Sequence, residues 1–244
     1  MHRFYADTQR SDNSRFLLSP EDLHHARKVL RLRPGEQAEV FFCGKRFLSD
    51  ISVTDTGEIE LLPRKELQFT EPHLSVTLFQ GLPKGDKMDF IVQKAVELGA
   101  SRIVPVVFSR CIVRLSNAES ERKLDRWRRI AREAGKQSGR CIIPEILPPV
   151  QIAELHSFFS SCEHITLPWE ECPEGGPLSF SKRYPSIASL GIVIGPEGGI
   201  TQEEVEYCKQ YGCETITLGK RILRTETAGL AALSVFFGLY GEME

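Results

Sequence analysis

The spacing of hydrophobic and polar positions divides the chain near residue 70. In the amino-terminal part, short runs of β-strand character are separated by turn residues such as Pro34-Gly35. These runs are AEVFFC, RFLSDISVT and EIELLP. One helix precedes them over PEDLHHARKVLRL, with Ser19 as its N-cap and Pro20 in its first turn. The pattern predicts a small barrel or sheet with one helix.

After a stretch that reads as a linker, KELQFTEPH, strands and helices alternate. The expected strands are apolar throughout, namely LSVTLF, RIVPVVF, HITL, GIVI and TITL. The expected helices between and after them include MDFIVQKAVELG, SNAESERKLDRWRRIAREAGKQSGR, QIAELHSFF, TQEEVEYCKQYG and the carboxyl-terminal segment. Apolar strands that alternate with helices are typical of a parallel sheet covered by helices. We therefore predict an α/β protein with domains over residues 1–70 and 74–244.

Ligands of such sheets bind beyond the carboxyl ends of strands, so the turns found there are candidate sites. One turn lies in LGIVIGPEGGITQEE, where Gly195, Gly198 and Gly199 would let the backbone approach a ligand closely. Alternatively, Pro196 and these glycines only form a tight turn. The next helix starts with a capping box, Thr201–Glu204. The glycine spacing matches neither the dinucleotide nor the triphosphate motif. The other two strand ends read TITLGKRILRTETA and HITLPWEECPEGG.

The composition, with 41% apolar and 26% charged residues, is that of a globular protein. No apolar run reaches the about 20 residues of a membrane span, and the first residues lack the apolar core of a signal peptide. We therefore expect a cytoplasmic protein. Seven scattered cysteines form no C-x-x-C pair, which favours free thiols. No His, Cys or Asp set has metal-ligand spacing, so no metal is expected.

The net charge is −2, yet basic residues are concentrated in 122–140. That helix should begin with a capping box, Ser116–Glu119. Its apolar stripe would consist of Leu124, Trp127, Ile130, Ala131 and Ala134. Its outward basic residues would be Arg126, Arg129, Arg132, Lys136 and Arg140. Such a face either contacts nucleic acid or is simply solvated, with local ion pairs.

Four collinear motifs make a resemblance specific. They are GLPKGDKMDFIVQKAVELGAS, RWRRIAREAGKQSGR, IGPEGGITQEE and LGKRILRTETAGL. Together with MHRF and HHARKVLRLRPGE, they closely resemble the RsmE family of 16S ribosomal RNA uridine N3-methyltransferases. The resemblance implies a PUA-like RNA-binding domain, then a SPOUT-type domain with a carboxyl-terminal trefoil knot. It also implies a homodimer that uses S-adenosylmethionine to methylate N3 of uridine 1498 in 16S rRNA, within the 30S subunit. Two alternatives remain, another target such as a ribose 2′-oxygen, or a non-catalytic rRNA assembly factor.

The residues that would carry this function fall into two binding groups. The expected donor-binding residues are Leu167, Ile194, Gly195, Glu197, Gly198, Gly199, Leu218, Gly219, Leu223 and Thr225. The expected RNA-binding residues are Arg3, His24, His25, Arg31, Lys84, Lys87, Arg129, Arg132 and Arg140. Of the adjacent His24 and His25, one should face RNA and the other the core, because neighbouring helical residues point in different directions.

The catalytic candidates are Arg224 and Glu226, at the start of the last helix. Uridine N3 is a weak acid, so its methylation requires removal of a proton or stabilisation of negative charge on the neighbouring carbonyl oxygens. Arg224 would stabilise that charge. Glu226 would orient the guanidinium or accept the proton, while Thr225 would cap the helix. The alternative is that Arg224 and Glu226 form only an ion pair that holds the turn.

The last helix, 228–240, is apolar around almost its full circumference. This pattern predicts a helix covered on two sides, by its own sheet and by a second subunit. The alternative is a helix enclosed within one subunit.

Overall fold

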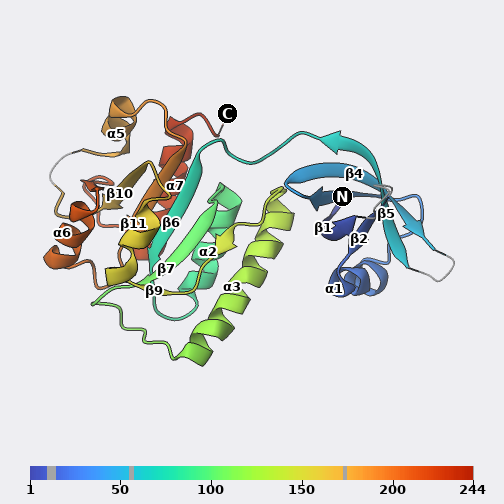
Figure 1. The fold of residues 1–244 in the computed structure, drawn as a ribbon, viewed down its shortest axis with the longest axis horizontal. Helices are drawn as coiled ribbons and strands as arrows, with labels where there is room; N and C mark the ends of the chain where they lie inside the picture. Colours follow the sequence, from blue (N-terminus) through green and yellow to red (C-terminus); the bar gives the residue numbers. More distant parts are fainter. Residues whose placement is uncertain (10–14, 55–57, 173–174, 244) are drawn as a thin grey trace. The chain divides into compact units, whose positions relative to one another are not determined.

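The computed structural model describes residues 1–9, 15–54, 58–172 and 175–243, which form two compact units (Figure 1). The first unit contains Met1–Glu71 and Gly135–Ile143, and the second contains Pro72–Ala134 and Pro144–Glu244. The first is a small barrel and the second a parallel sheet with helices, which confirms the predicted α/β class. The domain boundaries 1–70 and 74–244, and the trefoil knot, stay predictions.

The first unit is a closed barrel with the strand order β1-β2-β5-β4-β3. Its strands are β1 (His2–Gln9), β2 (Phe16–Leu18), β3 (Gln37–Phe42), β4 (Lys45–Val53) and β5 (Ile59–Leu67). The three runs expected from the sequence are β3, β4 and β5, so that prediction is confirmed. The linker was predicted to begin too early. Lys65–Leu67 still belong to β5, because they pair with Arg46–Leu48 of β4.

Strand β1 was not predicted, because its two buried residues, Phe4 and Tyr5, are adjacent and lie on opposite faces, so its sequence does not alternate. Phe4 points into the barrel core with Phe16 and Leu61. Tyr5 points to the other side, against Phe41 and Cys141. The Tyr5 hydroxyl also donates a hydrogen bond of 2.8 Å to the carbonyl oxygen of Arg140. These contacts explain why residues 135–143 belong to the barrel unit.

The predicted first helix is present as α1 (Pro20–His24), and it continues as a π-helical turn, His25–Val29. The Ser19 cap is confirmed, because the amide of Asp22 donates to its hydroxyl oxygen at 3.1 Å. The expectation that one of His24 and His25 faces the core is wrong, because both are exposed. Buried Ala26 and partly buried Leu23 take the inward positions on either side of them.

The second unit is a sheet with the order β12-β10-β11-β6-β7-β8, in which every pairing is parallel, as predicted. Its strands are β6 (Ser75–Gly81), β7 (Arg102–Val107), β8 (Glu145–Ile146), β10 (His164–Pro168), β11 (Ser189–Ile194) and β12 (Cys213–Ile216), with β9 (Val150–Gln151) paired to β7. Because β6 lies beside β11, segments more than 100 residues apart end at the same edge.

The main helices lie where the sequence predicts them. They are α2 (Lys87–Leu98), α3 (Asn117–Ser138), α6 (Gln202–Gln210) and α7 (Thr225–Leu239). A short helical pair, Ile152–Glu154 and α4 (His156–Phe159), precedes β10, and α5 (Pro177–Arg183) was not predicted. Helix α7 packs against α2, α5, β6 and β11. It therefore starts close to the edge where β6 and β11 end.

Both predicted capping boxes are confirmed. Glu119 and Ser116 exchange hydrogen bonds at the start of α3, and Thr201 and Glu204 do so at the start of α6. The apolar stripe of α3 is also confirmed, with Trp127 only 1% exposed.

Candidate functional site

A chain of buried hydrogen bonds joins the carboxyl ends of β6 and β11 to the start of α7. The Thr225 hydroxyl donates to the carbonyl oxygen of Gly195 at 2.6 Å and accepts from the Gln80 amide nitrogen at 2.8 Å. Gly81 follows Gln80, and a Cβ atom on it would lie 2.5 Å from the nitrogen of Pro196. Only glycine therefore lets the end of β6 lie this close to the turn after β11. These contacts hold the end of β6, the turn after β11 and the start of α7 together, and the three segments form the floor of the site.

The glycine-rich turn after β11 is closely packed against another loop. A Cβ on Gly198 would lie 2.9 Å from both the Cβ and the carbonyl oxygen of Arg110, in the loop after β7. Gly199 has a φ of +74°, in the region that favours glycine, and its amide donates to the carbonyl oxygen of Pro196 at 3.0 Å. Both glycines are thus required by the turn itself.

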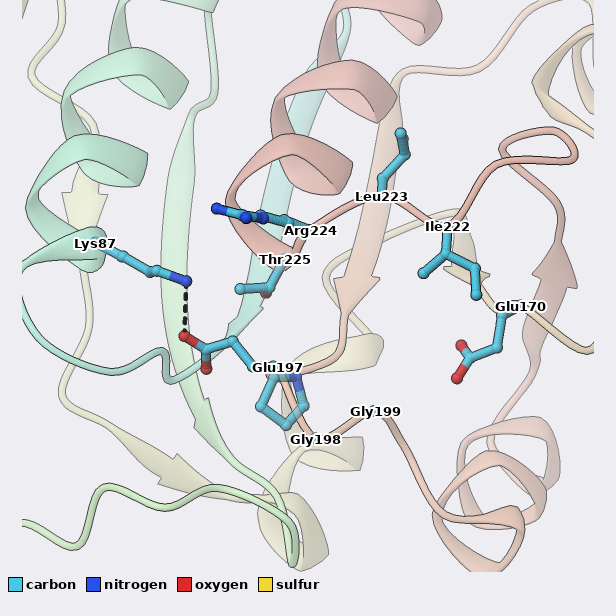
Figure 2. Close-up of a pocket in the computed structure, with 10 residues that line it drawn as sticks. Lys87, Glu170, Glu197, Gly198, Gly199, Ile222, Leu223, Arg224 and Thr225 are labelled. Carbon is cyan, nitrogen blue, oxygen red and sulfur yellow. Dashed lines mark hydrogen bonds and ion pairs between the residues drawn. The ribbon is translucent and has the colours of Figure 1, made fainter.

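A hollow of about 450 Å³ opens above this floor (Figure 2). Its walls come from the first residue of α2, the segment after β10, the glycine-rich turn and the start of α7. The lining residues are Lys87, Glu170, Pro196, Glu197, Gly198, Gly199, Ile222, Leu223, Arg224 and Thr225.

Lys87 connects two carboxylates at one side of the hollow. Its Nζ lies 3.0 Å from Oε1 of Glu197 and 3.2 Å from Oε2 of Glu226. The hydrogen bond to Glu197 is the largest contribution that raises the pKa of Lys87 above its ordinary 10.5. Burial would raise the pKa of Glu197, but its hydrogen bonds with Lys87 and with backbone amides outweigh burial and lower that pKa below 4.5. Lys87 and Glu197 are therefore a charged pair at neutral pH.

Arg224 is the N-cap residue of α7, and its side chain is exposed. Within the described parts of the chain, its guanidinium has no hydrogen bond or ion pair. The alternative of an Arg224–Glu226 ion pair is therefore wrong for this structure, as is the orientation of Arg224 by Glu226, because Glu226 binds Lys87 instead. The expectation that Thr225 caps α7 is also wrong. It is the first helical residue, and its hydroxyl binds Gly195 and Gln80.

Comparison with known proteins identifies the family. The RNA methyltransferase domain family matches residues 70–237, and the RNA methyltransferase PUA domain family matches residues 18–67. The ribosomal RNA small subunit methyltransferase E of Bacillus subtilis is 35% identical over 235 residues, which are 90% of this chain and 88% of that relative. The chain belongs to the ribosomal RNA small subunit methyltransferase E family.

Solved structures of this family have the same fold. The ribosomal RNA small subunit methyltransferase E of Neisseria gonorrhoeae, bound to S-adenosyl methionine, is 34% identical with a TM-score of 0.83, and the match covers 98% of each chain. A methyltransferase from Legionella pneumophila, solved in complex with the cofactor, is 30% identical with a TM-score of 0.81, over 97% of this chain and 96% of that one.

Ten residues were predicted to bind the donor. Five of them line the hollow: Glu197, Gly198, Gly199, Leu223 and Thr225. The other five are not part of the lining. Leu167 and Ile194 are buried within β10 and β11. Gly195, Leu218 and Gly219 lie in the two loops that lead to the hollow.

Besides the predicted catalytic Arg224, four lining residues were not predicted to bind the donor: Lys87, Glu170, Pro196 and Ile222. Glu170 lies two residues after the end of β10, and its position at a strand end was the only sequence signal for it. Ile222 is 87% exposed, although it is large and apolar. Exposed apolar residues are common on protein surfaces, so the sequence did not distinguish this one.

Among the predicted RNA-binding residues, five are exposed: His24, His25, Arg31, Lys84 and Arg129. Arg132 is partly exposed. Lys87 faces the hollow and is paired, as described above. Arg3 is partly buried, and its guanidinium binds Glu39 at 2.9 Å and the carbonyl oxygen of Lys136 at 3.2 Å.

Arg140 was predicted to point outward, and this is wrong. Its side chain is 6% exposed and pairs with Glu71 at 2.5 Å. Lys136 is also mostly buried, with its Nζ 2.7 Å from Asp22. Both residues lie in the stretch from Gly135 onward that belongs to the barrel unit. Their side chains therefore contact other residues of that unit and little solvent. Arg126 is exposed but pairs with Asp89 at 2.5 Å.

No helix in the described residues is long and apolar enough to cross a membrane. Among the same residues, no three His, Cys, Asp or Glu side chains gather as metal ligands would. All seven cysteines are free thiols.

Proposed function

We propose that the protein transfers a methyl group from S-adenosylmethionine to N3 of a uridine in 16S rRNA. The observation that carries this proposal is the exposed Arg224, which has no partner among the described residues, at the rim of a hollow on the carboxyl edge of the sheet. The family membership and the relatives that bind S-adenosyl methionine support it.

The hollow fits a methyl donor of this kind. Its volume lies in the range of about 300–1,000 Å³ that is usual for small-molecule sites. Leu223, Ile222 and Pro196 offer apolar walls, whereas Glu170 and Glu197 offer carboxylates, which suit the positive sulfonium and ammonium groups of the donor. When bound, the donor supplies a methyl group activated by its sulfonium.

The remaining predicted donor-binding residues are proposed to shape this site. Gly198, Gly199 and Thr225 border the hollow directly. The residues that would act from the strand ends and loops beneath or beside it are Leu167, Ile194, Gly195, Leu218 and Gly219.

The proposed catalytic group is Arg224. As N3 of uridine loses its proton, negative charge spreads to the adjacent carbonyl oxygens, and a cation placed there lowers the barrier. Arg224 is the N-cap residue of α7, so it stands at the helix end that carries a positive partial charge. Glu226 binds Lys87, so it could accept the proton from uridine N3 only if this ion pair allows it.

For RNA binding, we propose the exposed residues His24, His25, Arg31, Lys84 and Arg129, together with Arg132. The barrel, residues 1–70, would be the PUA-like RNA-binding domain, and residues 74–244 the methyltransferase domain. Arg3 and Arg140 are already paired with Glu39 and Glu71, so the proposal gives them a structural part instead.

We further propose that the protein is a cytoplasmic homodimer that acts on the 30S subunit. The support for a dimer is α7, which packs on its own sheet yet leaves Val235 44% exposed. A second subunit would cover this side.

Mass spectrometry of nucleosides tests the function. The purified protein and labelled donor are added to 30S subunits from a strain that lacks the corresponding gene, and the 16S rRNA is digested. We expect labelled N3-methyluridine. A label on a ribose 2′-oxygen would show a different target, and tight RNA binding without any label would show an assembly factor.

A further inference from the structure

At the rim of the hollow, a lysine from α2 binds a carboxylate at the start of α7, the helix end where Arg224 is the N-cap residue. Glu226 binds Nζ of Lys87 at 3.2 Å, and Lys87 also binds Glu197 at 3.0 Å. Arg224 precedes Glu226 by two residues at the same helix end. Figure 2 shows its guanidinium extending to the same side as Lys87. Among the described residues, this guanidinium has no ion pair.

An arginine and a carboxylate so close in sequence would ordinarily attract each other. Guanidinium and carboxylate form strong, often bidentate hydrogen bonds, which a lysine forms less well. Here the carboxylate is held by a lysine from a different helix, 139 residues away in sequence. The same lysine is fixed by a second carboxylate, Glu197, so its ammonium stays beside Glu226. Arg224 is thereby left without its nearest acidic partner.

The availability of the arginine matters for the proposed reaction. A guanidinium already paired with a carboxylate has less positive field to offer a nucleobase, and the pair must be broken before the base can bind. Preorganised charge avoids this reorganisation during the reaction.

We propose that Lys87 is a positioning residue that holds Glu226 away from Arg224 and so keeps the guanidinium available to the target base. This inference rests on the proposed methyltransferase function. It gives Lys87 a different task from the RNA contact expected from the sequence.

The test is a suppression experiment on the full-length protein. In Lys87→Met, Glu226 is released and captures Arg224, so kcat falls by at least about tenfold, toward the roughly 100-fold scale for losing one oxyanion-stabilising donor. The KM for the methyl donor stays within about twofold, because the loss concerns the transition state. In Lys87→Met/Glu226→Gln, the carboxylate nearest to Arg224 in sequence is gone, and most of the lost kcat returns.

Two control variants are measured beside Lys87→Met and the double variant. Lys87→Arg keeps a cation between the two carboxylates and should retain activity. Lys94→Met removes another lysine of α2, one that pairs with Glu97 away from the hollow, and should leave kcat unchanged. Thermal unfolding of each variant shows whether it is folded, and Lys87→Gln replaces Lys87→Met if the latter is not.

Three results would overturn the inference. The first is a double variant no more active than Lys87→Met, which would mean that Glu226 does something else, such as accepting the proton. The second is a Lys87→Met variant with the activity of the unchanged protein. The third is a loss seen only in the KM for the donor, which would make Lys87 part of the donor site. Failure of the unchanged protein to methylate uridine N3 would instead reject the proposed function.

Discussion

The hydroxyl of Thr225 donates a hydrogen bond of 2.6 Å to the carbonyl oxygen of Gly195. This bond attaches the first residue of α7 to the residue that follows β11. Because Gln80 of β6 donates to the same hydroxyl oxygen at 2.8 Å, one side chain connects three segments beneath the hollow. The stability of the site should therefore depend on this threonine more than on the exposed residues around it.

Replacing Thr225 with valine should destabilise the second unit. Valine has nearly the same shape, but it removes the hydrogen bond to the Gly195 carbonyl and one of the two hydrogen bonds of the Gln80 amide nitrogen, which keeps its bond to the Gly81 carbonyl oxygen. Each unsatisfied buried group costs about 1–3 kcal/mol, so we expect a loss of about 2–4 kcal/mol. Urea unfolding followed by tryptophan fluorescence measures it, because Trp127 and Trp169 both lie in this unit. Thr225→Ser keeps the hydroxyl and should lose much less. Equal losses in the two variants would contradict the role of the hydroxyl.

Replacing Arg224 with alanine should lower turnover on saturating 30S subunits by about 100-fold or more, the scale for losing one oxyanion-stabilising group. Donor affinity, measured by calorimetry, should change little, because the guanidinium acts on the base. Arg221→Ala is the matched control, since Arg221 is an exposed arginine in the same loop and is not part of the lining. Turnover within a few-fold of the unchanged protein would remove Arg224 from the catalytic role.

Replacing Arg129 with alanine should make RNA affinity less dependent on salt. Each phosphate contact contributes roughly 0.7 to 0.9 to the slope of log affinity against log salt, and Arg129 is exposed on α3. Filter binding at several salt concentrations gives the slope. Arg183→Ala is the control, because Arg183 is exposed on α5 but pairs with Glu214. An unchanged slope in Arg129→Ala would assign this residue to an ordinary solvated face.

Replacing Val235 with glutamate should dissociate the proposed homodimer. A charge on the exposed side of α7 cannot be buried against a second subunit without a large desolvation cost. Light scattering at micromolar concentration should show a particle of twice 27.5 kDa for the unchanged protein and 27.5 kDa for the variant. Val53→Glu alters a valine that is similarly exposed on the barrel, and it should leave the mass unchanged. A monomer without any substitution would reject the dimer.

Much of the fold could be predicted from local patterns. The capping boxes result from interactions between residues close in sequence, and the apolar strands and the helical stripe of α3 have a local composition or spacing that can be recognised without their partners. Strand β1 and helix α5 could not be predicted in this way. Only Phe4 and Tyr5 of β1 are buried, and distant segments cover them on opposite faces, while α5 is a seven-residue helix with little periodicity.

The candidate site was predicted less completely, for a related reason. The glycine-rich turn and the start of α7 have recognisable sequences, and the family resemblance drew attention to them. No local motif shows which distant side chains meet in the folded protein. Lys87 meets Glu197 across 110 residues, and Thr225 meets Gly195 across 30. The sequence therefore suggested a helix cap for Thr225 and an RNA contact for Lys87, whereas the fold supplies other partners.

The close approach of Gly81 to Pro196 has a consequence for mutational scanning. A selection for methylation would find position 81 as intolerant as Arg224, because even alanine would place a carbon 2.5 Å from a backbone nitrogen. Fitness scores alone would then mark Gly81 as catalytic, although it does not line the hollow. Gly85, with nothing within 4 Å of its added Cβ, shows the opposite case, where the backbone angle alone limits substitution. A library for altering donor preference should therefore leave codon 81 fixed and diversify the hollow from position 222, whose side chain is open to solvent.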